Sequence, residues 1–132
     1  MGRVVHFEIQ ADDLERAKAF YAMAFDWAYE DYSEFTGSPY FGVITGEDGE
    51  MGINGGLLQR PVPAPGLGAG TNAFVCTMGV EDFDHTHAKI IEAGGVVAME
   101  KYALPGMAWQ GYYVDTEGNT FGIHQPDESA GM

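Results

Sequence analysis

An internal repeat is the sequence feature that most constrains the fold. The two halves of this 132-residue chain match at an offset of 69 positions. The matched segments are Asp13-Leu14-Glu15 with Asp82-Phe83-Asp84, Tyr40-Phe41-Gly42 with Trp109-Gln110-Gly111, and Glu47-Asp48-Gly49 with Thr116-Glu117-Gly118. With a shift of one further residue, Gly52-Ile53-Asn54 corresponds to Gly122-Ile123-His124. The common spacing indicates a duplicated module rather than chance identities.

Each half predicts the same order of elements. In the first half, alternating β-formers predict a strand over 4–9, Asp12 or Asp13 can cap a helix that ends near Phe25, and three further strands follow. The predicted strands of the first half are 4–9, 27–30, 40–45 and 51–57. The second half predicts strands 73–78, 96–102, 109–115 and 120–124, with a helix over 82–93. The fold class is therefore α+β, with the order βαβββ twice.

A segment rich in proline and glycine predicts how the chain divides. Residues 59–71 carry three prolines at alternate positions followed by glycines, which is typical of a linker. This segment separates module one, 1–58, from module two, 72–126, within a single domain. The small polar tail 127–132 is expected to fray.

The charge balance excludes several classes of partner. Six Lys and Arg against twenty Asp and Glu give a formal net charge of −14, which disfavours nucleic acid and anionic membranes. The acidity suits a cationic ligand, or it serves only solubility. A lone Cys76 excludes an internal disulfide, and the chain shows neither a signal peptide nor an apolar run long enough to cross a bilayer. We expect a cytoplasmic protein without nucleic-acid or membrane partners.

Several segments resemble one protein family. The segments 4–9, 13–17 and 20–21, together with Asp115-Thr116-Glu117-Gly118-Asn119-Thr120-Phe121-Gly122-Ile123, resemble the vicinal oxygen chelate superfamily, which includes glyoxalase I, bleomycin-resistance proteins and extradiol dioxygenases. The resemblance covers nearly the whole chain. It implies two βαβββ modules whose curled mixed sheets form a central cup, with one helix per module on the outer face. It also implies a homodimer.

Strand alternation predicts which side chains line the cup. Val5, Phe7 and Ile9 form the apolar set that should lie under the first helix, as Phe74, Cys76 and Met78 should lie under the second. The predicted ligand-binding residues are His6, Glu8, Asn54, Thr77, Trp109 and His124. Tyr40 and Trp109, at matched positions, form either aromatic walls at the mouth of the cup or ordinary sheet packing. The polar lining binds a ligand, or it only pairs with water and neighbouring groups.

The resemblance also implies where a metal would bind. In metal-dependent relatives four ligands come from the first and last strands of the two modules. Mapped onto this chain they fall on His6, on Gly52 or its neighbour Ile53, on Val75 and on Gly122. Three of these positions lack a donor, so we expect no metal cofactor. The alternative is a divalent ion held by a shifted set, His6, Glu8 and His124.

The sequence therefore predicts a metal-free protein that binds a small molecule in the cup, with a cationic or aromatic compound as the candidate ligand. The alternative is an enzyme. It is either a metal-dependent lyase, isomerase or dioxygenase with a non-standard ligand set, or a metal-free acid/base catalyst that uses His6 and Glu8. A third alternative is an interaction module without a small ligand.

Overall fold

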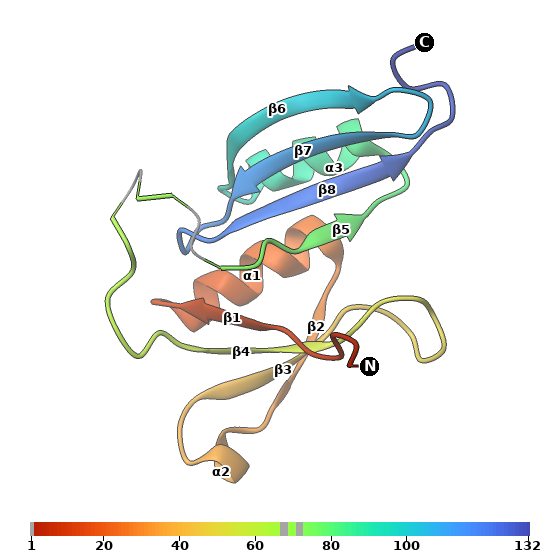
Figure 1. The fold of residues 1–132 in the computed structure, drawn as a ribbon. Coiled ribbons are helices and arrows are strands. Elements are labelled where there is room, and N and C mark those ends of the chain that lie inside the picture. The colour runs from red at the N-terminus through yellow and green to blue at the C-terminus, as the bar shows by residue number, and fades with distance from the viewer. Residues whose placement is uncertain (1, 67–68, 71–72) are drawn as a thin grey trace. The chain divides into compact units, whose positions relative to one another are not determined.

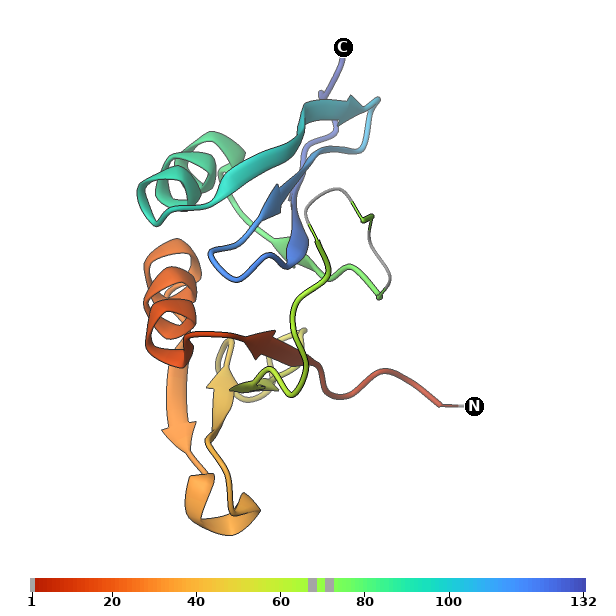
Figure 2. The same cartoon turned by 90° about the vertical axis from the view of Figure 1, so that its left-hand side faces the viewer.

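The computed structural model describes residues 2–66, 69–70 and 73–132, and the chain divides into two compact units, Met1–Ala64 and Pro65–Met132 (Figure 1). The division lies inside the segment predicted as a linker. Each unit contains a four-stranded mixed sheet, and Figure 2 shows a helix along one side of each sheet. The predicted α+β class is confirmed.

The first unit follows the predicted order with one addition. Its elements are β1 (Glu8–Ala11), α1 (Leu14–Phe25), β2 (Ala28–Asp31), α2 (Ser33–Thr36), β3 (Tyr40–Ile44) and β4 (Gly55–Gln59). The sheet order is β1-β4-β3-β2, in which only β1 and β4 run parallel. Helix α1 begins where the Asp13 carboxylate accepts a hydrogen bond from the Arg16 backbone N–H at 3.0 Å. The four-residue helix α2, between β2 and β3, was not predicted.

The core of the first unit forms between α1 and one face of its sheet. Tyr21 of α1 stacks on Trp27 at 4.9 Å between ring centroids, and Phe7 contacts the same indole at 5.8 Å. Phe7 and Trp27 therefore lie on the helix side, as predicted for Phe7. Val5 does not: its side chain is exposed, because the strand starts at Glu8 and not at position 4. The prediction for Val5 was wrong.

The second unit repeats the order without a counterpart of α2. Its elements are β5 (Thr77–Gly79), α3 (Phe83–Glu92), β6 (Val96–Leu104), β7 (Ala108–Val114) and β8 (Thr120–Pro126), in the sheet order β5-β8-β7-β6. Asp82 caps α3 as Asp13 caps α1, by accepting a hydrogen bond from the His85 N–H at 3.1 Å. The paired caps support the duplication that the offset of 69 indicates.

The second core lies between α3 and the sheet, but it omits two residues predicted to belong to it. Phe83 and Ile90 of α3 are buried, as are Phe121 and Ile123 of β8. Phe74 and Cys76 are exposed. Strand β5 begins only at Thr77, so the preceding residues never pass beneath the helix, and the prediction of a buried Cys76 was wrong.

The C-terminal tail is folded back rather than frayed. Asp127 donates its backbone N–H to the Met107 carbonyl at 2.8 Å, and Gly106 donates to the Ala130 carbonyl at 2.9 Å. Ala130 is fully buried. The expectation of a frayed tail was wrong, because this turn closes over the β6–β7 connection. Among the described residues, no helix combines the length and apolarity needed to cross a bilayer.

Candidate functional site

Strand pairing defines which positions of the two modules are equivalent. Glu8 of β1 pairs with Gly56 of β4, and Thr77 of β5 pairs with Gly122 of β8. Gly56, not Gly52, is therefore the counterpart of Gly122. The β3–β4 connection is longer than the β7–β8 connection. A comparison of the two halves at an offset close to 69 therefore matched Gly122 with Gly52 instead of Gly56.

The same pairing corrects the third strand of each module. Tyr40 pairs with Leu58, and Gln110 pairs with His124. Because Leu58 and His124 each lie two residues beyond the matched glycine, Tyr40 is the counterpart of Gln110 and not of Trp109. A slip of one residue moves a side chain to the opposite face of a sheet.

In the first unit, three polar side chains meet on the sheet face opposite α1. The Tyr40 hydroxyl donates a hydrogen bond to Glu8 Oε2 at 2.8 Å and lies 3.1 Å from His6 Nε2. The His6 and Glu8 side chains are 50% and 46% exposed, and His6 Nε2 lies 3.8 Å from Glu8 Oε2. Two predicted site residues, His6 and Glu8, are therefore brought together by a tyrosine that was not included in the predicted ligand-binding set.

The environment of Tyr40 favours its neutral hydroxyl. Burial, then the hydrogen bond and negative charge of Glu8, raises the pKa of Tyr40 to about 12. Its hydroxyl and ring lie over Gly56, in the space that a side chain at that position would need. Glycine at this position is thus required for Tyr40 to reach Glu8.

In the second unit, the equivalent face carries polar side chains but no carboxylate at the position of Glu8, where Thr77 stands. His124 Nδ1 lies 2.8 Å from Gln110 Oε1, and Gln110 is buried. Gly122 is surrounded by Thr77 Oγ1, the Tyr112 ring and Gln110 Nε2, all about 3 Å from the position of an added Cβ. Thr77 and His124 lie on this face as predicted, whereas sequence reasoning missed Gln110 because of the slipped comparison.

Trp109 lies on the other face of this sheet. It alternates with Gln110 along β7. The Lys101 Nζ lies 4.6 Å from the Trp109 indole and 5.2 Å from the ring of Phe83 in α3. Its Nε1–H donates to Asp127 Oδ2 at 3.1 Å. Trp109 was predicted to line the site with Thr77 and His124. This prediction was wrong because Gln110, and not Trp109, is the counterpart of Tyr40.

Asn54 serves the connection that precedes β4. Its Oδ1 accepts a hydrogen bond from the Thr45 N–H at 2.9 Å, and the Thr45 hydroxyl donates to the Ile53 carbonyl at 2.7 Å. Asn54 also borders an open, polar hollow of about 220 Å³ formed by residues 45–52 and 54. The hydrogen bonds of Asn54 therefore close this loop.

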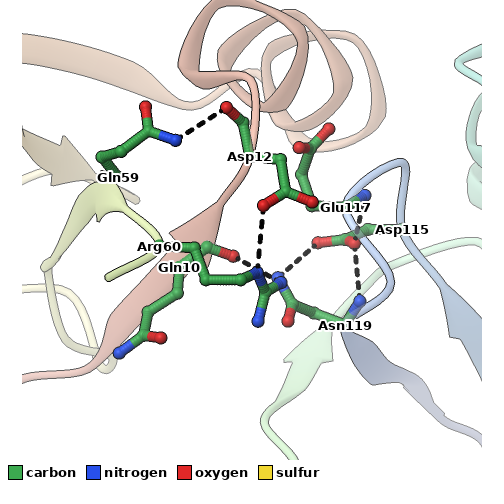
Figure 3. A network of polar contacts seen from close by, with 7 residues as sticks. All are labelled: Gln10, Asp12, Gln59, Arg60, Asp115, Glu117 and Asn119. Carbon is green, nitrogen blue, oxygen red and sulfur yellow. Dashed lines mark hydrogen bonds and ion pairs between the residues drawn. The ribbon is translucent and has the colours of Figure 1, made fainter. Parts of the chain in front are cut away.

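Further polar groups, drawn in Figure 3, join the ends of β1 and β4 in the first unit and stabilise the β7–β8 turn in the second. Arg60 Nη2 donates to the Gln10 carbonyl at 3.1 Å, and Arg60 Nε lies 3.5 Å from Asp12 Oδ1. In the β7–β8 turn, Asp115 Oδ1 accepts from the N–H groups of Glu117 and Asn119, both at 2.8 Å. Asp115, part of the segment that carries the family resemblance, thus shapes a turn.

The residues at the family's metal positions do not fit a divalent ion. By the corrected equivalence the four positions are His6, Gly56, Val75 and Gly122, and only His6 carries a donor. The Tyr40 hydroxyl and Gln110 Nε2 occupy or border the spaces beside the two glycines. Across residues 2–66, 69–70 and 73–132, no three His, Cys, Asp or Glu side chains gather in a metal-binding arrangement.

Comparison with known proteins places these observations in a family. The model of the Glyoxalase/Bleomycin resistance protein/Dioxygenase superfamily matches residues 3–123. CFP32 of Mycobacterium bovis, which is named as a glyoxylase, is 24% identical over 129 residues, which cover 94% of this chain and 46% of that protein. The chain therefore spans about half the length of the curated relatives it matches.

Solved structures share the fold at low sequence identity. A fosfomycin resistance protein from Listeria monocytogenes has a TM-score of 0.71 at 17% identity, with 96% of this chain and 93% of that chain covered. A glyoxalase/bleomycin resistance protein/dioxygenase family enzyme from Burkholderia phytofirmans PsJN has a TM-score of 0.69 at 20% identity, with 91% and 95% covered. A variant of the Listeria protein, solved with Mn(II) and a dihydroxypropylphosphonic acid, has a TM-score of 0.69 at 16% identity, with 94% and 90% covered. The chain belongs to the Glyoxalase/Bleomycin resistance protein/Dioxygenase superfamily.

Proposed function

We propose that this protein binds a small organic molecule on the polar face of its first sheet, without a divalent metal ion. The observation that carries the proposal is the Tyr40 hydroxyl, which lies over Gly56 and donates to Glu8. An accessible carboxylate, an imidazole and an aromatic ring then meet at one place. This combination suits a cationic or aromatic compound.

The charge of the chain supports a cationic ligand. The formal net charge is −14, which raises the local concentration of cations and lowers that of anions. Strands β1 to β4, described throughout, contain no Lys or Arg. An anionic ligand would therefore meet the Glu8 carboxylate without a compensating positive charge from the sheet.

A ligand screen in the presence of a chelator tests the proposal. We expect cationic aromatic amines to raise the melting temperature of the wild-type protein, since a ligand that binds the folded state stabilises it. Glu8→Gln should abolish most of the shift. Glu34→Gln, which removes an exposed carboxylate of α2, should leave it nearly unchanged and controls for net charge. Stabilisation by anionic aromatics instead, or equal losses in both variants, would contradict the proposal.

The alternative function is a metal-dependent enzyme, and one solved neighbour holds Mn(II). Elemental analysis of protein purified without chelator separates the two functions. We expect a substoichiometric transition-metal content. One equivalent of metal, lost in His6→Ala or His124→Ala, would favour the enzyme.

A further inference from the structure

A row of four residues crosses the first sheet on the face opposite α1. Glu30 of β2 pairs with Gly42 of β3, Gly42 pairs with Gly56 of β4, and Gly56 pairs with Glu8 of β1. The two central strands therefore contribute glycines, and the two outer strands contribute carboxylates. Paired residues on neighbouring strands lie on the same face, so both carboxylates emerge on the side that carries Tyr40.

Each glycine of the row is covered by a tyrosine whose hydroxyl reaches the adjacent glutamate. Tyr40 lies over Gly56 and donates to Glu8. Tyr32 lies over Gly42, with its ring 2.5 Å from the position of an added Cβ, and its hydroxyl donates to Glu30 Oε2. The arrangement thus occurs twice, as a tyrosine ring laid on a glycine with a carboxylate at its hydroxyl end.

The two tyrosines are themselves neighbours. The Tyr32 N–H donates to the Tyr40 carbonyl at 2.9 Å, which continues the β2–β3 ladder by one pair. Because each ring lies against a glycine of the sheet, its opposite face points away from the sheet. Tyr32, Glu30 and Glu8 are all exposed. The Tyr32 ring and two carboxylates are therefore accessible, and Tyr40 is partly exposed.

We propose that these two Tyr–Glu pairs form a two-point site for an elongated organic dication, such as a linear diamine. This inference rests on the proposed function and specifies its ligand class. Three strand spacings separate the Cα atoms of Glu8 and Glu30 by roughly 14 Å, so a single small cation reaches one carboxylate only. A chain with an ammonium group at each end reaches both, while its middle crosses the tyrosine rings.

The second unit provides an internal contrast. The corresponding row there is Thr77, Gly122, Tyr112 and Met99, which contains no carboxylate. The acidic and aromatic pairs are therefore a property of the first sheet and not of the repeated fold.

Calorimetric titration with linear diamines of different length, in chelator and physiological salt, tests the proposal. The probes are diaminobutane, diaminodecane and decylamine, the last as a monocation of equal length. We expect diaminodecane to bind roughly tenfold more tightly than decylamine or diaminobutane, since a second carboxylate and a second ring each add a modest contribution. Glu30→Gln should remove that advantage. Glu34→Gln, with the same charge change nearby, should alter the affinity by less than about twofold.

The outcomes distinguish this inference from the proposed function. Equal affinities for the diamine and the monoamine, or equal effects of Glu30→Gln and Glu34→Gln, would overturn the two-point site even if Glu8-dependent binding of aromatic amines persists. If no amine binds in chelator, the proposed function fails as well. Tyr32→Phe, which removes the hydroxyl that holds Glu30, provides a second variant should Glu30→Gln fold poorly, and it should likewise weaken diaminodecane but not decylamine.

Discussion

Tyr40 lies over Gly56, with its hydroxyl in the space that any side chain at position 56 would need. The two residues come from adjacent antiparallel strands, β3 and β4. The backbone of Tyr40 pairs with Leu58, and its side chain crosses β4 over Gly56 to reach Glu8 on β1. The glycine leaves room for the Tyr40 ring, and the Tyr40 hydroxyl is held at Glu8. The glycine also leaves position 56, one of the family's metal positions, without a side chain that could bind a metal ion.

Gly56→Ala should therefore expel the Tyr40 hydroxyl and break its bond to Glu8. We expect a loss of about 1–2 kcal/mol in the free energy of unfolding, as is usual when a methyl group is forced into an occupied space. Urea denaturation measures the change. Gly79→Ala is the matched control, because an added Cβ there meets nothing within 4 Å. Equal stability of the two variants would show that Tyr40 does not need the glycine.

The pH dependence of stability should report on Tyr40. Its pKa rises from 10.0 to about 12 on folding, so the stability it contributes is fully present below pH 10 and is lost as the pH rises through about 12. Tyr40→Phe removes this contribution. Wild type should thus lose more stability than Tyr40→Phe between pH 10 and 12 in parallel denaturation curves. The other tyrosines whose pKa is raised titrate equally in both proteins. Equal losses of stability in wild type and Tyr40→Phe would therefore contradict a raised pKa for Tyr40.

Gln110 should matter more to the second sheet than its surface-like residue type suggests. Gln110→Ala leaves His124 Nδ1 without its partner at 2.8 Å and should cost about 1–3 kcal/mol of unfolding free energy. Gln110→Glu retains an acceptor at the same place and should restore most of the loss. Chemical denaturation of both variants gives the comparison. If Gln110→Ala leaves the free energy of unfolding unchanged, the Gln110–His124 pair has no structural role.

The C-terminal turn should open in acid. Hydrogen bonds from Ser129, and then from the Trp109 indole, lower the pKa of Asp127 below 3.8. The stabilisation is therefore present above pH 3.8 and is lost as the pH falls through the lower, folded value. Trp109 fluorescence in a Trp27→Phe background should report the transition. Ser129→Ala should move its midpoint to higher pH, and an unchanged midpoint would show that Ser129 does not hold this carboxylate.

Sequence reasoning recovered most of the fold, because the signals were local. Asp13 and Asp82 mark the starts of both main helices, and hydrophobic alternation located the strands to within a few residues. The strand ends were less accurate. The apolar residues Val5 and Phe74 predict longer first strands, yet pairing starts only at Glu8, opposite Gly56, and at Thr77, opposite Gly122.

The candidate site depended on register, which sequence reasoning fixed only in part. His6 and Glu8 were placed correctly relative to α1, because alternation along one strand is a local property. Trp109 was misplaced and Gln110 was missed because the second module has one residue more between β5 and β7 than the first module has between β1 and β3. A one-residue error in matching β3 to β7 exchanged the two faces. Only strand pairing shows that Tyr40 and Gln110 are equivalent.

The most direct test of the central claim is the dissociation constant of a bound aromatic amine, measured by calorimetry in excess chelator and again with saturating Mn(II). Because the family's metal positions include Gly56, Val75 and Gly122, we predict the same dissociation constant under both conditions and a marked weakening in Glu8→Gln. Binding that occurs only after Mn(II) is added, and that is lost in His6→Ala, would contradict the account.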